Sequence, residues 1–295
     1  MNKVTQTKFQ EVVNKVISKM ETAGTSWTKD WTTHGIQSGS PKNISGRYYN
    51  GFNIFHLLTV GFTEGYKDST WGTFNQFKKA NCKIKKGEKG TPIFFWDTFI
   101  TTEEKIEDRK AIPFVKTFTV FNVAQVEGYK GEVIAESPEE IKATFDNDKN
   151  VDLWVKATGL NITHKNQDKA FYMPSKDFIM MPESKQFKTK AGYYSTLFHE
   201  MIHATGSDTR LKRVFGRSMK DSKYAMEELV AEFGASFLCI SHGIVAEPRI
   251  DHAKYINGWI ALLKDKPTAL MTATSKAFKA CEWLQQQAEP KELVA

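Results

Sequence analysis

Apolar positions change their spacing several times along the chain, and each change marks a predicted element. Residues 5–21 place apolar side chains three and four positions apart, which predicts an opening amphipathic helix. The following segment, 24–55, is rich in Gly, Ser, Asn and aromatic residues and predicts loops and short strands. A short helix is predicted over 73–81, and the aromatic and β-branched residues of 92–96 and 113–123 predict the two strands of a hairpin.

The periodic pattern breaks over 127–140, where Gly and Glu are frequent, and we place a domain junction near 128–137. A helix start follows, with Ser137 as N-cap, Pro138 in the first turn and Glu140 at the capping-box position. Beyond it the pattern predicts short strands at 170–173 and 177–181, and helices at 191–205, 221–242, 251–264 and 273–288.

The expected fold class is therefore α+β, in two domains. Residues 1–130 form a small mixed α+β domain, and residues 131–295 form a second domain in which helices dominate.

The composition is that of a folded protein. Hydrophobic residues make up 40% of the chain and charged residues 25%, so we expect a packed core rather than disorder. The three cysteines stand far apart without a CxxC pair, which argues against a disulfide framework or a Cys-based zinc site and favours a reducing compartment. The chain opens without a signal-peptide pattern, and no segment has the roughly 20 apolar residues that span a bilayer. We expect a cytoplasmic protein without a membrane partner.

The excess positive charge lies in the first half. Residues 1–130 hold 19 Lys and Arg against 12 Asp and Glu, whereas residues 131–295 hold 22 of each, so the net charge of +7 belongs to the first domain. A basic domain beside a neutral one indicates a polyanionic partner. A solvated lysine surface without a partner is the alternative.

The most specific chemical signal is the run His199-Glu200-Met201-Ile202-His203. On a helix, the four-residue spacing places both imidazoles on one face, where they can bind a single ion. Zinc accepts neutral imidazole nitrogens and keeps one position for water in catalytic sites, and Glu200 can activate that water as general base. The flanking residues are apolar, as expected for a buried active-site helix. Two helix-face histidines without a metal are the alternative.

The third ligand lies elsewhere, because the extended HExxHxxGxxH pattern would need a histidine at the position of Thr209. Downstream, residues 226–232 offer carboxylates on a second predicted helix. This segment resembles the Glu-ligand helix of gluzincin-type peptidases, which implies Glu228 as metal ligand and Glu232 as acceptor of the other ring N–H of a ligand histidine. Glu227 is expected at a solvated position, and surface charge is the alternative for the other two acids. Such a ligand set suits zinc, with manganese or another divalent transition metal as the alternative.

Two further features bear on hydrolysis. The strand 177–182 lies shortly before the metal helix, where an edge strand can pair with an extended substrate, although an ordinary core strand is at least as good an interpretation. No oxyanion-stabilising residue is evident from the sequence. The candidates by proximity along the chain are Tyr193, Tyr194, Tyr224 and His242.

The first 130 residues also carry 20 of the 37 aromatic residues, several of them among basic and polar neighbours. Lys and Arg follow phosphates and aromatic faces stack on unpaired bases, so this mixture favours single-stranded over duplex DNA. Core packing is the alternative, and we expect it for Phe9, Phe55, Phe77, Phe118 and Phe121. The predicted DNA-binding residues are Arg47, Tyr48, Tyr49, Trp71, Lys83, Lys85, Lys86 and Lys89.

Stretches in both halves resemble one family. In the first half they are 41–43, 46–53, 71–74, 86–90 and 120–125, and in the second they are 199–206, 210–213 and 224–232. They are similar, in the same order, to ArdC-type plasmid antirestriction proteins and to the N-terminal region of TraC primases of conjugative plasmids.

The resemblance implies an N-terminal single-stranded-DNA-binding domain and a C-terminal zincin-like metallopeptidase domain. It adds Asn53, within the matching stretch 46–53, to the DNA-binding candidates. It also implies a role in conjugation, where the incoming strand must survive host restriction. Three functions stay open: protective coating of single strands, an active metallopeptidase that cleaves a host protein, and a metal-stabilised scaffold without hydrolytic activity.

Overall fold

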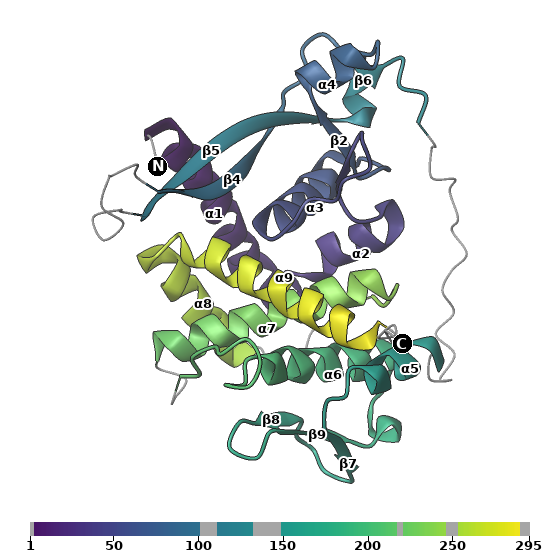
Figure 1. The fold of residues 1–295 in the computed structure, drawn as a ribbon, viewed down its shortest axis with the longest axis vertical. Coiled ribbons are helices and arrows are strands. Elements are labelled where there is room, and N and C mark those ends of the chain that lie inside the picture. Colours follow the sequence, from purple (N-terminus) through teal and green to yellow (C-terminus); the bar gives the residue numbers. More distant parts are fainter. Residues whose placement is uncertain (1–2, 101–110, 132–148, 217–220, 246–252, 290–295) are drawn as a thin grey trace.

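Helices fill the middle of the molecule, between a four-stranded sheet at one end and a three-stranded sheet at the other (Figure 1). The structure is a computed structural model that describes residues 3–100, 111–131, 149–216, 221–245 and 253–289. The α+β class is confirmed. In the described part of the chain, no helix is long and apolar enough to cross a membrane.

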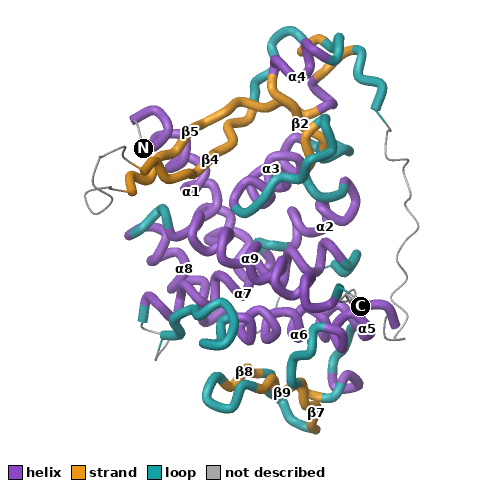
Figure 2. The backbone as a smooth tube through the Cα atoms, viewed as in Figure 1, coloured by secondary structure: helices purple, strands orange, loops and turns teal. Residues whose placement is uncertain are grey.

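The first half contributes a group of helices and, beyond them, the strands together with one short helix at the end of the molecule (Figure 2). Its helices are α1 (Lys3–Ala23), α2 (Lys29–Ser38), α3 (Phe52–Glu64) and α4 (Phe74–Lys79). Its strands are β1 (Lys42–Asn43), β2 (Thr70–Thr73), β3 (Lys83–Ile84), β4 (Thr91–Ile100), β5 (Ala111–Asn122) and β6 (Val126–Glu127).

The predicted hairpin is confirmed as β4 and β5, which pair antiparallel with Thr91 opposite Val120 and Trp96 opposite Val115. They belong to the sheet with strand order β1-β2-β5-β4, while β3 and β6 form a separate small ladder. The short predicted helix is confirmed as α4, and its start is set by a capping box in which Thr73 and Gln76 exchange hydrogen bonds.

The expectation of loops and short strands over 24–55 is wrong for α2 and for the start of α3. The α2 sequence contains Thr and Gly, which have low helix propensity, so its pattern resembles a loop. Burial stabilises the helix instead, since Trp31 is only 3% exposed and Thr32 is fully buried. The predicted helix start at Ser137 lies outside the described residues.

The second half provides the lower helices and the small sheet. Its helices are α5 (Lys149–Ala157), α6 (Lys190–Thr205), α7 (Ser222–Ser241), α8 (Ala253–Asp265) and α9 (Ala269–Ala288), and its strands are β7 (Ile162–Lys165), β8 (Phe171–Met173) and β9 (Phe178–Pro182). The helices predicted from apolar periodicity are confirmed as α6 to α9.

The strand order in the small sheet is β7-β9-β8. The strand predicted over 177–182 is therefore the central strand β9, so of the two interpretations the core strand is confirmed and the edge strand is not. The edge strands are β7 and β8, of which β8 pairs antiparallel with β9 and packs against α6.

One hydrophobic core runs through both halves of the chain. Trp27 packs edge to face on Phe233 of α7, with ring centroids 5.4 Å apart, and Trp31 packs on Phe237 at 6.0 Å. The boundary at residue 130 stays a prediction, but the helices on its two sides share a packed interior. Side chains of both halves therefore contribute to one hydrophobic core.

Candidate metal centre

Helix α6, which carries the HExxH run, lies between α7 and the small sheet (Figure 1). Thr189 caps its first turn by accepting a hydrogen bond from the Gly192 N–H at 3.0 Å. Beyond that turn the helix is buried on all sides, and Phe198, Met201 and Ile202 are fully buried. The two histidines are consequently held on a helix that packing fixes in position and rotation.

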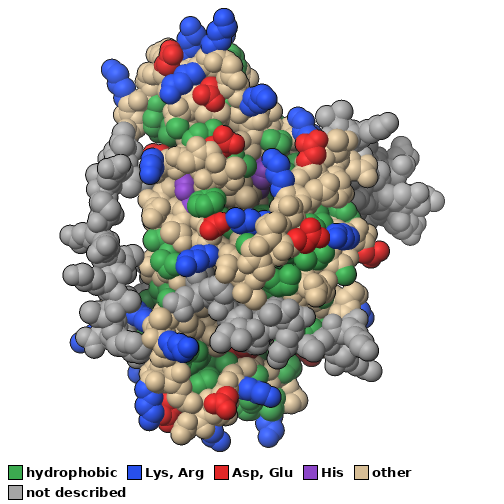
Figure 3. Space-filling view, turned by 180° about the vertical axis from the view of Figure 1, so that it is seen from behind, with side chains coloured by type: hydrophobic (Ala, Val, Ile, Leu, Met, Phe, Trp, Pro, Cys, Tyr) green, Lys and Arg blue, Asp and Glu red, His purple; other side chains and the backbone are tan. Residues whose placement is uncertain are grey.

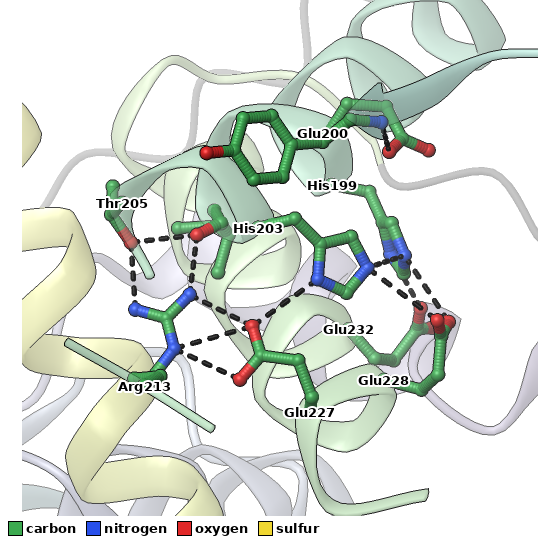
Figure 4. Close-up of polar contacts among 10 residues, drawn as sticks. His199, Glu200, His203, Thr205, Arg213, Glu227, Glu228 and Glu232 are labelled. Carbon is green, nitrogen blue, oxygen red and sulfur yellow. Dashed lines mark hydrogen bonds and ion pairs between the residues drawn. The ribbon is translucent and has the colours of Figure 1, made fainter. Parts of the chain in front are cut away.

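The structure brings the three predicted metal ligands together (Figure 4). The Nε2 atoms of His199 and His203 lie 3.1 Å apart. The Glu228 carboxylate on α7 lies opposite them, 3.4 Å from Nε2 of His199 and 3.6 Å from Nε2 of His203. All three side chains are buried, and their ligand atoms lie within 4.8 Å of one another.

Acidic residues also lie beside the outward ring nitrogens. Glu232 Oε2 is 3.9 Å from Nδ1 of His199, beside the ring nitrogen that the gluzincin resemblance implied but too far for a direct hydrogen bond. Glu227 Oε1 is 3.2 Å from Nδ1 of His203. The expectation that Glu227 is solvated is wrong, because this carboxylate is only 4% exposed. The Glu227 acceptor keeps a proton on Nδ1 of His203, so the Nε2 lone pair of this ring is available to an ion.

Glu227 is itself held by a buried arginine. Nη2 and Nε of Arg213 donate to its carboxylate at 2.9 and 3.0 Å. Burial would raise the pKa of Glu227, but its hydrogen bonds to His203 and Arg213 outweigh that effect and the pKa is lowered. Burial likewise opposes the charged form of His203, and the carboxylates around it nevertheless raise its pKa.

Glu200, which follows His199 on α6, lines the same pocket. It is 4% exposed, and its Oε2 accepts a hydrogen bond from the backbone N–H of Tyr172 on β8 at 2.9 Å. The pocket has a volume of about 350 Å³. Its walls are largely aromatic, with Phe171, Tyr172, Phe215, Tyr224 and Tyr255 around the histidines and acids.

Of the four oxyanion-stabilising candidates, Tyr224 lines this pocket. Its hydroxyl lies 3.2 Å from that of Tyr255. Burial, together with hydrogen bonds to Tyr255 and Glu228, raises its pKa, so it stays a proton donor at neutral pH. The other three candidates are engaged elsewhere: Tyr193 with His164, Tyr194 with Asp152 and His242 with Trp154.

The donor set fits a divalent transition metal. Two imidazole nitrogens and one carboxylate converge on a point beside an open pocket, and each histidine has an acid at its other ring nitrogen. Three protein ligands with a free side are typical of catalytic zinc sites.

The predicted DNA-binding residues separate into accessible and buried groups. Arg47 and the four lysines are exposed, and Tyr48 is 64% exposed. Lys85 also donates to the Ala124 carbonyl at 2.7 Å. Lys and Arg side chains cap the end of the molecule that carries α4 and β6, although others are scattered over the surface (Figure 3).

Two of these predictions need correction. Trp71 is fully buried in a small core cluster with Leu57 and Val120, so its ring is not accessible to a base. Asn53 is 8% exposed and exchanges hydrogen bonds with the backbone of Phe94, at 2.7 and 3.0 Å. Both residues support the fold. Tyr49 is half-buried against the same small cluster.

The core assignments of aromatic residues hold for Phe9, Phe55 and Phe77, which are buried. The assignment is wrong for Phe118, which is 47% exposed because it lies on the outer face of β5. Phe95 of β4 is 48% exposed, and it shares that face because its cross-strand partner, Lys116, stands two residues from Phe118. Phe121 is half-buried.

Comparison with known families matches both halves of the chain. A family model described as the N-terminal domain of anti-restriction factor ArdC matches residues 6–121. A second, described as a zincin-like metallopeptidase, matches residues 149–276. The expected C-terminal zincin-like domain is thereby confirmed.

Known proteins match the chain as a whole. The crystal structure of the antirestriction protein ArdC from plasmid R388, in its metal-free form, is 34% identical with a TM-score of 0.78, covering 95% of this chain and 97% of that one. Its Mn(II)-bound form is 32% identical, with the same TM-score of 0.78 and coverage of 96% and 99%.

Among curated proteins, y4eC of Sinorhizobium fredii, described as uncharacterised, is 31% identical over 95% of this chain and 92% of its own length. A DNA primase TraC of Escherichia coli is 32% identical over 94% of this chain, which spans only 20% of that primase. Over its whole length, therefore, the chain belongs to the family of ArdC antirestriction proteins, with a zincin-like metal-binding domain in its C-terminal half.

Proposed function

We propose that this protein binds single-stranded DNA without sequence preference and protects incoming plasmid DNA during conjugation. The observation that carries the proposal is the exposure of Arg47 and Tyr48 in the basic half of the chain. An exposed aromatic ring beside a guanidinium offers a stacking face next to a phosphate contact. The exposed lysines at 83–89 extend the basic surface.

Physical shielding is the simplest mode of protection. Phosphate contacts supply affinity that is independent of sequence, and base stacking favours strands whose bases are unpaired. Relatives named as DNA primases support a DNA partner. Two TraC primases match this chain over 20% and 26% of their own length.

The test compares single-stranded and duplex DNA of the same sequence, with the full-length protein. We expect tighter binding to the single strand, and the variant Arg47→Ala/Tyr48→Ala should lose affinity and lose protection of DNA from a restriction nuclease in vitro. Equal affinity for both DNA forms would remove the stacking argument.

A second function is favoured by the pocket. We propose that the metal centre is a peptidase site, held by His199, His203 and Glu228, because Glu200 lies in the same pocket as the ligands. Zinc, or manganese in its place, would polarise a bound carbonyl and lower the pKa of a bound water. A host protein is the expected substrate.

The residues of the chain have separate tasks in this reaction. The Glu200 carboxylate takes the proton of the attacking water and is oriented by the Tyr172 N–H. The Tyr224 hydroxyl donates to the oxygen that becomes negative in the transition state. Glu227 keeps the Nδ1 proton of His203, Glu232 places a negative charge near Nδ1 of His199, and the aromatic walls restrict water.

The variant Glu200→Gln separates the two functions, because it removes the base but leaves the ligands. We expect it to retain metal, DNA binding and most protection of DNA in vitro. Normal DNA binding with loss of antirestriction in cells would overturn the shielding proposal in favour of peptidase action. Antirestriction in cells that survives Glu200→Gln but needs the metal ligands would favour a metal-stabilised scaffold.

A further inference from the structure

The turn after α6, Arg210-Leu211-Lys212-Arg213, has no role in the functions proposed so far. Its two arginines bind two different acids, Arg213 the Glu227 carboxylate and Arg210 the Asp177 carboxylate. We propose that this turn is a positioning device for the site, in which Arg213 orients the ligand His203 and Arg210 orients the base Glu200. The inference rests on the proposed metal centre.

The first arm runs from Arg213 to the metal ligand. Its guanidinium donates to Glu227, which accepts from Nδ1 of His203 at 3.2 Å. The remaining donors go to the end of the metal helix: Nη1 to the Thr205 hydroxyl at 2.8 Å and Nη2 to the Ile202 carbonyl at 2.5 Å. The side chains of Arg213 and Glu227 are 4% and 5% exposed. The planar fork therefore fixes the carboxylate relative to the helix that carries the histidine.

The second arm runs from Arg210 to the base. Its Nη1 and Nη2 donate to the two carboxylate oxygens of Asp177, at 2.6 and 2.9 Å. Asp177 accepts from the hydroxyl of Tyr172 at 2.8 Å, and the backbone N–H of Tyr172 donates to Glu200 at 2.9 Å. The side chain and the backbone of Tyr172 are thus both held, which sets the position of β8 against Glu200.

Arg210 is anchored at its other side as well. Nη1 also donates to the Ala204 carbonyl at the end of α6, at 2.9 Å. The guanidinium lies 5.7 Å above the ring of Trp283 on α9. These contacts tie the small sheet, the metal helix and α9 to one residue.

Backbone hydrogen bonds fix the conformation of the turn and with it the directions of the Arg210 and Arg213 side chains. The N–H of Arg210 and that of Lys212 donate to the Ser207 carbonyl, at 2.9 and 3.0 Å, and the N–H of Arg213 donates to the Gly206 carbonyl at 2.9 Å. A Cβ on Gly206 would lie 3.0 Å from Nη2 of Arg213. The same Cβ would lie 2.8 Å from Cζ of Phe215, so the glycine that follows the HExxH run makes room for both side chains.

The two arms predict separable effects, which a purely structural role would not produce. Loss of the first arm weakens the ligand histidine and leaves the base in place. Loss of the second displaces the base and leaves the ligands in place. Substitutions in the first arm should therefore change metal affinity. Substitutions in the second arm should change the binding of a metal chelator whose proton is taken by the base.

The first measurement is the Zn²⁺ affinity of the full-length, metal-stripped protein, by competition with a chromophoric chelator. We expect Glu227→Gln and Arg213→Lys to weaken Zn²⁺ binding by about 10–100-fold. Arg210→Lys makes the same substitution in the second arm and is the matched control. It should leave Zn²⁺ affinity unchanged. The thermal stability of each metal-free variant is recorded alongside.

The second measurement is the affinity of acetohydroxamate for the Zn²⁺-loaded protein, because the proton of this chelator is taken by a neighbouring carboxylate. We expect Asp177→Asn and Arg210→Lys to weaken acetohydroxamate binding by about tenfold, as expected for one displaced charge-assisted hydrogen bond. Glu200→Gln should cause the same loss, and adding Asp177→Asn to it should cause no further loss.

Failure of the wild-type protein to bind Zn²⁺ or Mn²⁺ would overturn the metal centre and this inference with it. If the wild type binds Zn²⁺ but the variants of both arms keep its metal and acetohydroxamate affinities, only the inference is overturned. Loss of metal-free thermal stability with wild-type affinities would likewise make the turn merely structural.

Discussion

Trp27 and Phe233 pack edge to face, with ring centroids 5.4 Å apart and planes at 86°. Trp27 lies between α1 and α2, whereas Phe233 follows Glu232 on the helix that supplies the predicted ligand Glu228. The position of that helix thus depends on an aromatic residue from the basic half of the chain. We therefore expect the two halves to unfold together.

Trp27→Ala should destabilise the whole protein. Its indole is 1% exposed, and removing it from a core costs about 3–5 kcal/mol in free energy of unfolding. The measurement is denaturant unfolding followed by circular dichroism. Tyr48→Ala, at a residue that is 64% exposed, is the control and should change stability by less than about 0.5 kcal/mol. Two separate transitions, with only the first affected by Trp27→Ala, would show independent domains instead.

His203→Ala should abolish metal binding at the proposed site. An ion bound to the folded state raises stability by about 2.7 kcal/mol when its concentration is 100 times the Kd, so the variant should lose the gain in thermal stability that Zn²⁺ gives the wild type. Elemental analysis and melting with and without Zn²⁺ measure both effects. Glu200→Gln is the control that keeps the metal. A bound ion in contact with Glu227 or Glu232 in place of Glu228 would refute our ligand assignment.

Charge reversal at Lys83, Lys86 and Lys89 should weaken single-strand binding equally for all sequences. Each phosphate contact that is lost should also flatten the dependence of log K on log salt by about 0.7. Lys85 is left intact because it donates to the Ala124 carbonyl. The matched control reverses the exposed lysines Lys169, Lys176 and Lys188 of the second half, which changes the net charge equally. An equal loss of affinity in the control would show that only overall charge matters.

Acid should destabilise the protein through His56. Burial lowers the pKa of His56 from 6.5 to about 4, a hydrogen bond to the Pro92 carbonyl opposes this effect, and Lys15 adds to it. Between pH 6.5 and about pH 4, His56 therefore binds a proton in the unfolded chain but not in the folded chain. The free energy of unfolding therefore falls as pH drops from 6.5 towards 4, by up to about 3 kcal/mol, and this contribution is constant below that window.

His56→Phe removes the titrating group and keeps a ring on Phe52, against which His56 stacks at 5.7 Å. We expect the variant to have a flatter pH dependence of unfolding between pH 6.5 and 4, measured by urea titration at several pH values. A slope as steep as that of the wild type would assign the acid sensitivity to other groups.

The sequence alone determined the local arrangement of the metal site. Four-residue spacing on a helix places His199 and His203 on one face whatever surrounds them. Apolar periodicity located α6 to α9 because long helices repeat the same pattern over several turns. The alternation of aromatic and β-branched residues located β4 and β5 in the same way.

Tertiary structure decided which side of each element is buried and what lies opposite it. Glu227 and Glu228 are neighbours in sequence, yet packing of α7 on α6 brings one to a ring Nδ1 and the other to the two Nε2 atoms. Trp71 is in a basic, polar neighbourhood in the sequence but lies in a core that α3 and β5 complete. Local periodicity defines faces, whereas the distances between faces depend on contacts between residues far apart in the chain, and no short window of sequence contains those contacts.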